Sequence, residues 1–140
     1  MAYSIGELCY LDSTASKVGD VMQIDPNKSI FIQLADFIRF EIYSGKRKPN
    51  SRLESIREMA IILEVNPNTI KRVYQVLEEE GLIYCHSTLG YFVCDSEAKI
   101  KENKQKYVTE QLKSFITILK NCNVSKEEIK QILGDIHGDY

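Results

Sequence analysis

The sequence lacks the features that define several large classes of protein. No apolar run approaches the ~20 residues needed to span a bilayer, and the N-terminus lacks the basic start and apolar stretch of a secretion signal. Neither the cysteines nor the histidines have the close spacing of metal ligands. They are Cys9, Cys85, Cys94, Cys122, His86 and His137. We therefore expect a cytoplasmic protein with reduced cysteines and with no metal or other cofactor.

Two further absences concern function. The sequence shows no nucleophile–base pair and no paired carboxylates, so an enzyme is the least favoured class. It also lacks a strong positive charge, since 18 Lys and Arg face 20 Asp and Glu for a formal net charge of -2. The charges are nevertheless separated along the chain. The basic group is Lys46, Arg47, Lys48, Arg52 and Arg57, and the acidic group is Glu78, Glu79 and Glu80. A basic edge with a distant acidic end suits a module that docks into a DNA groove, although any solvated surface carries charge clusters.

Residues 55–81 have the pattern of two short helices joined by a tight turn. Ser55 and Glu58 have the spacing of a capping box. Asn66 is a good N-cap for the second helix, Pro67 falls at its first position, and Gly81 ends it. A core face follows at helical spacing: Ile70, Val73, Tyr74 and Leu77. Polar residues lie off that face: Asn68, Thr69, Lys71, Arg72 and Gln75. Amides, a hydroxyl and cations at the start of an exposed helix suit base edges and phosphates.

The flanking segments complete a winged helix-turn-helix. Residues 30–44 form an amphipathic helix pattern that Gly45 stops. Residues 82–85 and 91–94 are rich in β-forming residues and enclose a turn with Gly90, so they predict a β-hairpin. Cys85 and Cys94 end and close this hairpin; they would face each other as a redox pair or serve as small half-buried residues. The predicted fold is mainly α with a small β-hairpin.

These motifs resemble the N-terminal domain of the GntR family of bacterial transcription regulators. The resemblance covers residues 29–95, about half of the chain. The matching motifs are residues 30–34, 42–45 with 48–49, 53–60, 80–83 and 90–93. Residues 65–70 are similar to the version in the YtrA subfamily, which carries a short two-helix tail in place of a large effector-binding domain. The subfamily often controls genes for ABC-type transporters, which the resemblance implies as the target class.

The resemblance also implies a set of DNA-binding residues. They are Ser55, Arg57, Asn66, Pro67, Asn68, Thr69, Lys71 and Arg72, with Ser87 and Thr88 of the wing. Arg57 matches a DNA-contacting arginine, and Lys71 matches an arginine that would bind a phosphate or a guanine. The alternatives are helix capping for Ser55, Asn66 and Thr69, and a salt bridge within the domain for Arg57.

The chain departs from the family pattern at several positions. Glu54 stands where the family usually has Pro, Asn50 where it has Gly, and Arg47 where it has Leu. Asn50 tolerates a left-handed turn, whereas Glu54 adds a negative charge beside the start of a helix that would face phosphates. The wing has no Lys or Arg in residues 82–94, so its contacts with DNA are in question.

The remaining segments suggest three regions. We expect an N-terminal extension at 1–24, the winged domain at 25–95 and a two-helix dimerisation tail at 96–140. Residues 1–21 show no periodicity; an upstream extension, a leader and a small extra element all remain open. The tail has a second capping box at Ser125 and Glu128 and two apolar stripes that a second copy would cover. The predicted interface residues are Leu112, Phe115, Ile116, Leu119, Ile129, Ile132, Leu133 and Ile136.

The leading function is therefore a homodimeric, sequence-specific repressor that binds a two-fold symmetric double-stranded DNA operator. The alternative is a winged helix that holds a protein partner, with little or no DNA binding. A small-molecule effector would have to use the dimer interface or the cleft between tail and winged domain, because no separate ligand domain is visible.

Overall fold

The computed structural model describes residue 22 and residues 24–136. The chain forms two compact units, Met1–Asn103 and Lys104–Tyr140, which we describe separately. Except for Met22 and Ile24, the extension predicted at 1–24 lies outside the described residues, as do Cys9 and His137. None of the described helices combines the length and the apolar character that crossing a membrane requires.

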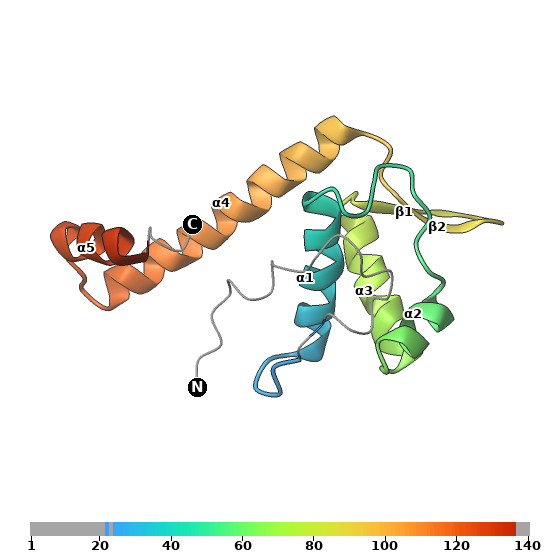
Figure 1. Ribbon diagram of the computed structural model, residues 1–140, viewed down its shortest axis with the longest axis horizontal. Coiled ribbons are helices and arrows are strands. Elements are labelled where there is room, and N and C mark those ends of the chain that lie inside the picture. Colours follow the sequence, from blue (N-terminus) through green and yellow to red (C-terminus); the bar gives the residue numbers. More distant parts are fainter. Residues whose placement is uncertain (1–21, 23, 137–140) are drawn as a thin grey trace. The chain divides into compact units, whose positions relative to one another are not determined.

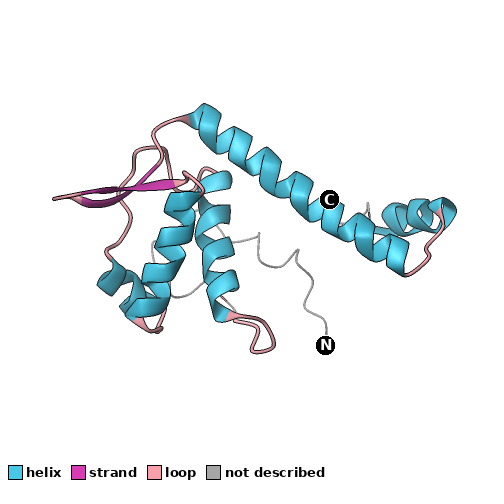
Figure 2. Ribbon diagram, turned by 180° about the vertical axis from the view of Figure 1, so that it is seen from behind, coloured by secondary structure: helices cyan, strands magenta, loops and turns pink. Residues whose placement is uncertain are grey.

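The first unit is a winged helix-turn-helix, as the sequence predicts (Figure 1). Its elements are α1 (Ile30–Tyr43), α2 (Ile56–Ile62), α3 (Pro67–Glu79), β1 (Ile83–His86) and β2 (Gly90–Val93), and it also contains the beginning of α4. Helices α1 and α3 lie side by side, and α2 packs against α3 near the end where α3 begins (Figure 2). The hairpin leaves the opposite end of α3.

Glycines follow the ends of α1 and α3 where the sequence predicts stops, and an asparagine forms a left-handed turn in the loop between α1 and α2. Gly45, with φ 78°, follows the C-cap of α1, and Gly81, with φ 74°, follows the C-cap of α3. Asn50 has φ 60°, the left-handed conformation expected of a residue that replaces glycine. At these three positions the backbone follows short-range signals that the sequence displays, whereas Glu64 after α2 has φ 54° without such a signal.

The core of the unit lies between α1, α2, α3 and the base of the hairpin. Its fully buried large side chains are Leu34, Ile38, Leu53, Met59, Ile70, Val73, Tyr74, Leu77, Leu82 and Val93. All four residues of the predicted core face of α3 are among them. The Tyr74 hydroxyl donates to the carbonyl oxygen of Glu54 at 2.7 Å, which fixes the segment before α2 on α3.

The hairpin differs from the prediction by one residue at each strand, and this changes its cross-strand pairs. Cys85 pairs with Tyr91, and Cys94 follows β2, with its N–H donating to the carbonyl oxygen of Leu82 at 2.8 Å. The two cysteines therefore do not face each other. Cys85 is exposed and Cys94 is buried.

The second unit contains most of α4 (Glu97–Asn121) and all of α5 (Lys126–Ile136). The predicted capping box begins α5, with the Ser125 N–H donating to Glu128 Oε2 at 2.7 Å and the Glu128 N–H to Ser125 Oγ at 3.2 Å. Neither helix contains a buried residue. Up to residue 136, where the described part of the chain ends, this unit thus has well-formed helices but no core of its own.

Candidate DNA-binding surface

The N-terminus of α2 presents a free cation on a rigid helix start. The Glu58 N–H donates to Ser55 Oγ at 3.2 Å, and the Ser55 N–H donates to Glu58 Oε2 at 2.8 Å, so the capping box is complete. The Ser55 backbone hydrogen bond holds the pKa of Glu58 below its ordinary value. Arg57 is exposed and forms no ion pair with another described residue. Ser55 therefore caps the helix, and Arg57 is free to meet a ligand.

The N-terminus of α3 is built in a similar way. Asn66 Oδ1 accepts the Asn68 N–H at 2.8 Å, and Pro67 is the first helical residue. The Thr69 N–H donates to the Asn66 carbonyl oxygen at 2.9 Å, and Thr69 itself is half-buried. Capping occupies the Asn66 side chain, whereas the exposed amide of Asn68 is available at the helix start.

The two cations of α3 differ in their surroundings. Lys71 is exposed and forms no ion pair with any described group. The guanidinium carbon of Arg72 lies 4.9 Å from the ring centroid of Phe31 on α1. Arg72 therefore joins α3 to α1 by a cation–π contact, a structural role that the sequence did not indicate.

The charged residues that depart from the family pattern bind one another. Arg47 Nε donates to Glu41 Oε2 at 2.6 Å, and Arg47 Nη1 donates to Glu54 Oε2 at 2.8 Å. Lys46 adds a contact of 3.3 Å to Glu41. Burial acts to lower the pKa of Arg47, but the hydrogen bonds and charges of Glu41 and Glu54 outweigh it and raise the pKa. The negative charge of Glu54 is thus neutralised within the domain.

The tip of the wing has no Lys, Arg, Asp or Glu and exposes both hydroxyl groups and the apolar Leu89, which is 55% exposed. Ser87 and Thr88 are exposed in the turn between β1 and β2, and Thr88 Oγ1 lies 3.3 Å from His86 Nδ1. On the strands, the rings of Tyr84 and Phe92 stack at 5.7 Å, and the Tyr84 hydroxyl donates to Asn50 Oδ1 at 2.7 Å.

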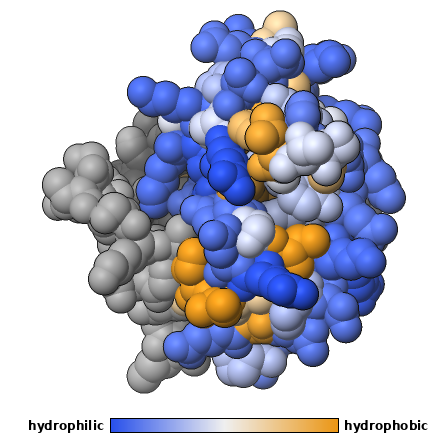
Figure 3. Space-filling view, turned by 90° about the vertical axis from the view of Figure 1, so that its right-hand side faces the viewer, coloured by the Kyte–Doolittle hydropathy of each residue, from blue (hydrophilic) through white to orange (hydrophobic). Residues whose placement is uncertain are grey.

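These elements lie on one side of the winged unit. Helix α2 and the hairpin lie at the right in Figure 1, and Figure 3, which views the molecule from that side, shows a described surface that is mostly hydrophilic with a few apolar patches. Of the basic group seen in the sequence, Arg47 is taken up by the internal network, whereas Lys48, Arg52 and Arg57 are exposed. The structure therefore reduces the available cations of this group, and Arg57 is the one that lies at a helix start.

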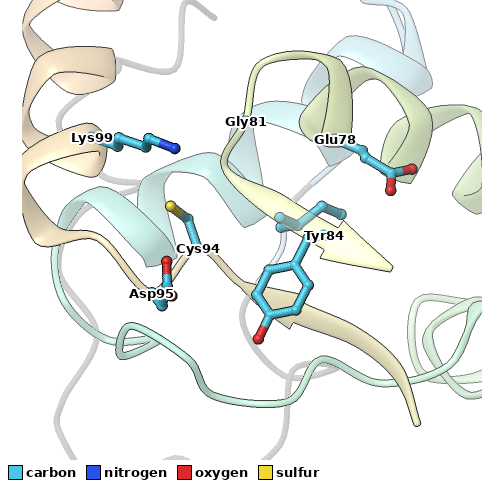
Figure 4. A pocket seen from close by; sticks show the side chains of 7 residues that line it. Glu78, Gly81, Tyr84, Cys94, Asp95 and Lys99 are labelled. Atoms are coloured by element: carbon cyan, nitrogen blue, oxygen red, sulfur yellow. The ribbon is translucent and has the colours of Figure 1, made fainter. Parts of the chain in front are cut away.

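A cavity of about 410 Å³ lies beside the base of the hairpin. Glu78, Tyr84, Cys94, Asp95 and Lys99 line it together with Gly81 and Ile83 (Figure 4). Both charges occur around it, on Lys99 and on the acids Glu78 and Asp95. Across residues 22 and 24–136, no group of three or more His, Cys, Asp or Glu side chains is arranged to hold a metal ion.

A helix-turn-helix with exposed cations at both helix starts, followed by a two-stranded wing, defines a winged-helix DNA-binding protein. No protein-family model matches the chain. Individual proteins do match it. The chain is 35% identical over 107 residues to the uncharacterized HTH-type transcriptional regulator YhcF of Bacillus subtilis, covering 76% of this chain and 88% of that protein.

Two further matches extend over most of the chain. The HTH-type transcriptional repressor YtrA of Bacillus subtilis is 33% identical over 125 residues, which cover 84% of this chain and 96% of YtrA. A GntR family transcriptional regulator from Listeria monocytogenes has a similar solved structure, with a TM-score of 0.72 and 30% identity. That match covers 80% of this chain and 98% of the Listeria chain.

The chain belongs to the GntR family and resembles its YtrA-like members. It is a DNA-binding transcription regulator, and the relatives that show this are regulators and not enzymes.

Proposed function

We propose that the protein is a homodimeric repressor that binds a two-fold symmetric DNA operator. In this proposal residues 25–95 bind one half-site and residues 96–140 join two copies. The protein would act in the cytoplasm, and genes for ABC-type transporters near its own gene are the target class. The observation that carries the proposal is the pairing of a DNA-binding unit with two helices, α4 and α5, that contain no buried residue.

The exposed apolar side chains of the tail support the dimer. Val108, Leu112, Phe115 and Ile116 on α4 are 47–56% exposed, and Ile132, Leu133 and Ile136 on α5 are 44–56% exposed. Leu119 and Ile129 are half-buried. Burying one large apolar side chain is worth ~1.5–3 kcal/mol, so a second copy that covered these stripes would gain a large free energy. Ile118 of α4 is also 56% exposed, but it was not predicted from the sequence.

The geometry of α2 and α3 supports specific roles in DNA binding. Arg57 and Lys71 are exposed cations on the two helices, and Asn68 exposes an amide at the start of α3. We assign base or phosphate contacts to these three residues. Ser55, Asn66, Pro67 and Thr69 shape the helix starts, whose free N–H groups attract phosphate. Arg72 contributes at the flank of this surface, and Ser87 and Thr88 contribute through the wing turn.

Repression is proposed from one relative. YtrA of Bacillus subtilis is named as a repressor, and the match to it covers 84% of this chain. A dimer that covers two adjacent half-sites would block access to a promoter without any catalytic step. The direction of regulation is tested by placing the selected operator before a reporter gene and adding the protein, which should lower transcription.

Selection of bound DNA from a random pool tests the function directly. The full-length protein should enrich a consensus with two-fold symmetry and bind it with an affinity that falls steeply as salt rises, because phosphate contacts release counterions. Arg57→Ala should weaken binding to that consensus by ~1–3 kcal/mol if the side chain contacts a base. Failure to enrich any sequence, with a salt-independent affinity for DNA, would favour the protein-partner alternative.

The dimer interface is tested in the full-length chain. Ile100 packs against the core of the winged unit and Asn103 donates a hydrogen bond to the Glu80 carbonyl oxygen, so truncation near residue 95 would disturb that unit as well. Leu112→Glu with Phe115→Glu should convert the dimer to a monomer in light scattering. It should also weaken operator binding about a hundredfold, because the link between half-sites is lost. Thr117→Glu, on the opposite face of α4, is the matched control and should leave the dimer intact.

A small-molecule effector is expected from the sequence at the dimer interface or between the tail and the winged domain, and the open depression at the base of the hairpin is a further place for one to bind. Its lining joins α3, the wing and the first turn of α4, so a ligand there would contact the recognition helix and the wing together. A thermal-shift screen of the wild type against Lys99→Ala tests this site; ligands of the cavity should stabilise the wild type more than the variant.

A further inference from the structure

The wing of this protein contains a third strand-like segment that the sequence does not reveal. The loop between α1 and α2 passes beside the hairpin before it reaches α2 (Figure 1). Its residues 50–53 pair with β2. The Asn50 N–H donates to the Val93 carbonyl at 3.1 Å, the Leu53 N–H to the Tyr91 carbonyl at 2.8 Å, and the Val93 N–H to the Ser51 carbonyl at 2.9 Å.

The pairing places Arg52 within the wing. Arg52 forms an antiparallel bridge with Phe92, which itself pairs with Tyr84 on β1. Directly paired residues share a face of a sheet, so Arg52, Phe92 and Tyr84 lie together on the face opposite the buried Leu53 and Val93. A Cβ added at Gly90 would lie 4.0 Å from both Nε and Nη2 of Arg52, so the guanidinium extends along the wing toward its turn.

The charge of Arg52 is available to a ligand. The side chain is exposed and forms no ion pair with any residue that the structure describes, unlike Arg47 five positions earlier. Its charge contributes to the lowered pKa of Glu58, after the larger effect of the Ser55 hydrogen bonds. Arg52 therefore lies between the wing turn and the start of α2, where Arg57 is also exposed.

We propose that Arg52 is the cation of this wing and binds a phosphate of the DNA that flanks the half-site occupied by α3. This inference rests on the proposed DNA-binding function and adds a residue to it. Residues 82–94 hold no Lys or Arg, so the hairpin has no cation of its own with which to hold the DNA backbone. The Arg52 guanidinium, which lies over the wing beside Gly90, supplies the charge, and its fork of N–H donors suits phosphate oxygens.

The experiment compares full-length wild type with Arg52→Ala, Arg52→Lys and the control Lys101→Ala on a duplex that carries the selected consensus. Lys101 is an exposed lysine of the same unit, on α4. Arg52→Ala should weaken binding about tenfold at low salt. It should also make the plot of log affinity against log salt shallower by about one unit of slope, which corresponds to one fewer released counterion. Arg52→Lys should keep the slope, and Lys101→Ala should change neither quantity. Thermal unfolding should be unchanged in all three variants.

The outcomes separate this inference from the proposed function. If the wild type shows no salt-dependent DNA binding, the proposed function fails and this inference fails with it. If the wild type binds with a steep slope and Arg52→Ala retains both the affinity and the slope, only the role of Arg52 is wrong. A lower melting temperature with an unchanged slope would show that Arg52 serves the fold, and would also overturn the inference.

Discussion

The two units of this chain use the same local signals with different results. Both contain a complete capping box, with a serine N–H to glutamate distance of 2.8 Å at Ser55 and 2.7 Å at Ser125. The winged unit buries a continuous core of apolar side chains, whereas α4 and α5 bury none. Capping and helical periodicity therefore specify helices equally well in both units. Only the winged unit has the tertiary contacts that make a folded domain by itself.

The largest effect is expected from a test that replaces one leucine in each unit. Leu34 is 0% exposed and Leu112 is 56% exposed. Leu34→Ala should lower the free energy of unfolding of the winged unit by ~2–5 kcal/mol, because it leaves a cavity in the core. Leu112→Ala should leave that transition unchanged and should raise the dissociation constant of the dimer. Chemical denaturation followed at two protein concentrations measures both.

If Leu112→Ala lowered the free energy of unfolding by an amount that does not depend on protein concentration, the proposed difference between the units would be wrong. The tail would then be stabilised within one chain. If Leu34→Ala left the unfolding transition of the winged unit unchanged, the proposed difference would also be wrong, because α1 would then not belong to the core.

A second test concerns the partly buried ion network of the winged unit. Arg47, whose side chain is 12% exposed, bridges Glu41 and Glu54. Arg47→Ala would leave the buried Glu41 with Lys46 alone. We expect a loss of roughly 2 kcal/mol, below the about 3–5 kcal/mol of a fully buried pair, because Glu54 is partly exposed. Urea denaturation of Arg47→Ala, Glu54→Ala and the double variant should show a combined loss smaller than the sum of the single losses.

These two tests also mark what could be predicted from the sequence. Ser55, Asn66 and Gly81 act within a few residues of themselves, so caps, helix ends and the core face of α3 were predictable. The contact of Arg72 with Phe31 joins two helices whose distance is fixed only by the fold, so it was not predictable.

The same reason explains why the hairpin was predicted only in part. Its existence follows from two β-rich runs and a glycine, but its register depends on how the strands meet the core, and a one-residue difference set Cys85 opposite Tyr91. The third strand at 50–53 has no sequence signal of its own, because its partners lie some 40 residues later, at 91 and 93. Arg52 was seen as part of a basic cluster, but its place in the wing was not predicted.

A smaller effect is expected when the two capping boxes are compared directly. Ser55→Ala should cost ~1 kcal/mol of unfolding free energy in the winged unit at any protein concentration. Ser125→Ala removes an equivalent cap, but its cost should appear in the stability of the dimer, because α5 has no core within its own chain. Thermal melts over a hundredfold range of protein concentration distinguish these outcomes. If both variants lowered the melting temperature equally at every protein concentration, the proposed role of the tail would be contradicted.

The smallest expected effect is a pH dependence that both boxes share. Hydrogen bonds from Ser55 lower the pKa of Glu58, and those from Ser125 lower the pKa of Glu128, each from an ordinary value of 4.5. A carboxylate whose pKa is lowered on folding stabilises the folded state fully above its unfolded pKa. That contribution is lost as the pH falls through the lower folded value. Glutamine can still accept the bond in a capping box but does not titrate. Between pH 6 and pH 3, Glu58→Gln should therefore lose less stability than the wild type in the winged transition, and Glu128→Gln should show the same difference in dimer dissociation. Parallel pH profiles for wild type and Glu58→Gln would show that this carboxylate is not the titrating cap, and the comparison between the two units would then rest on their cores alone.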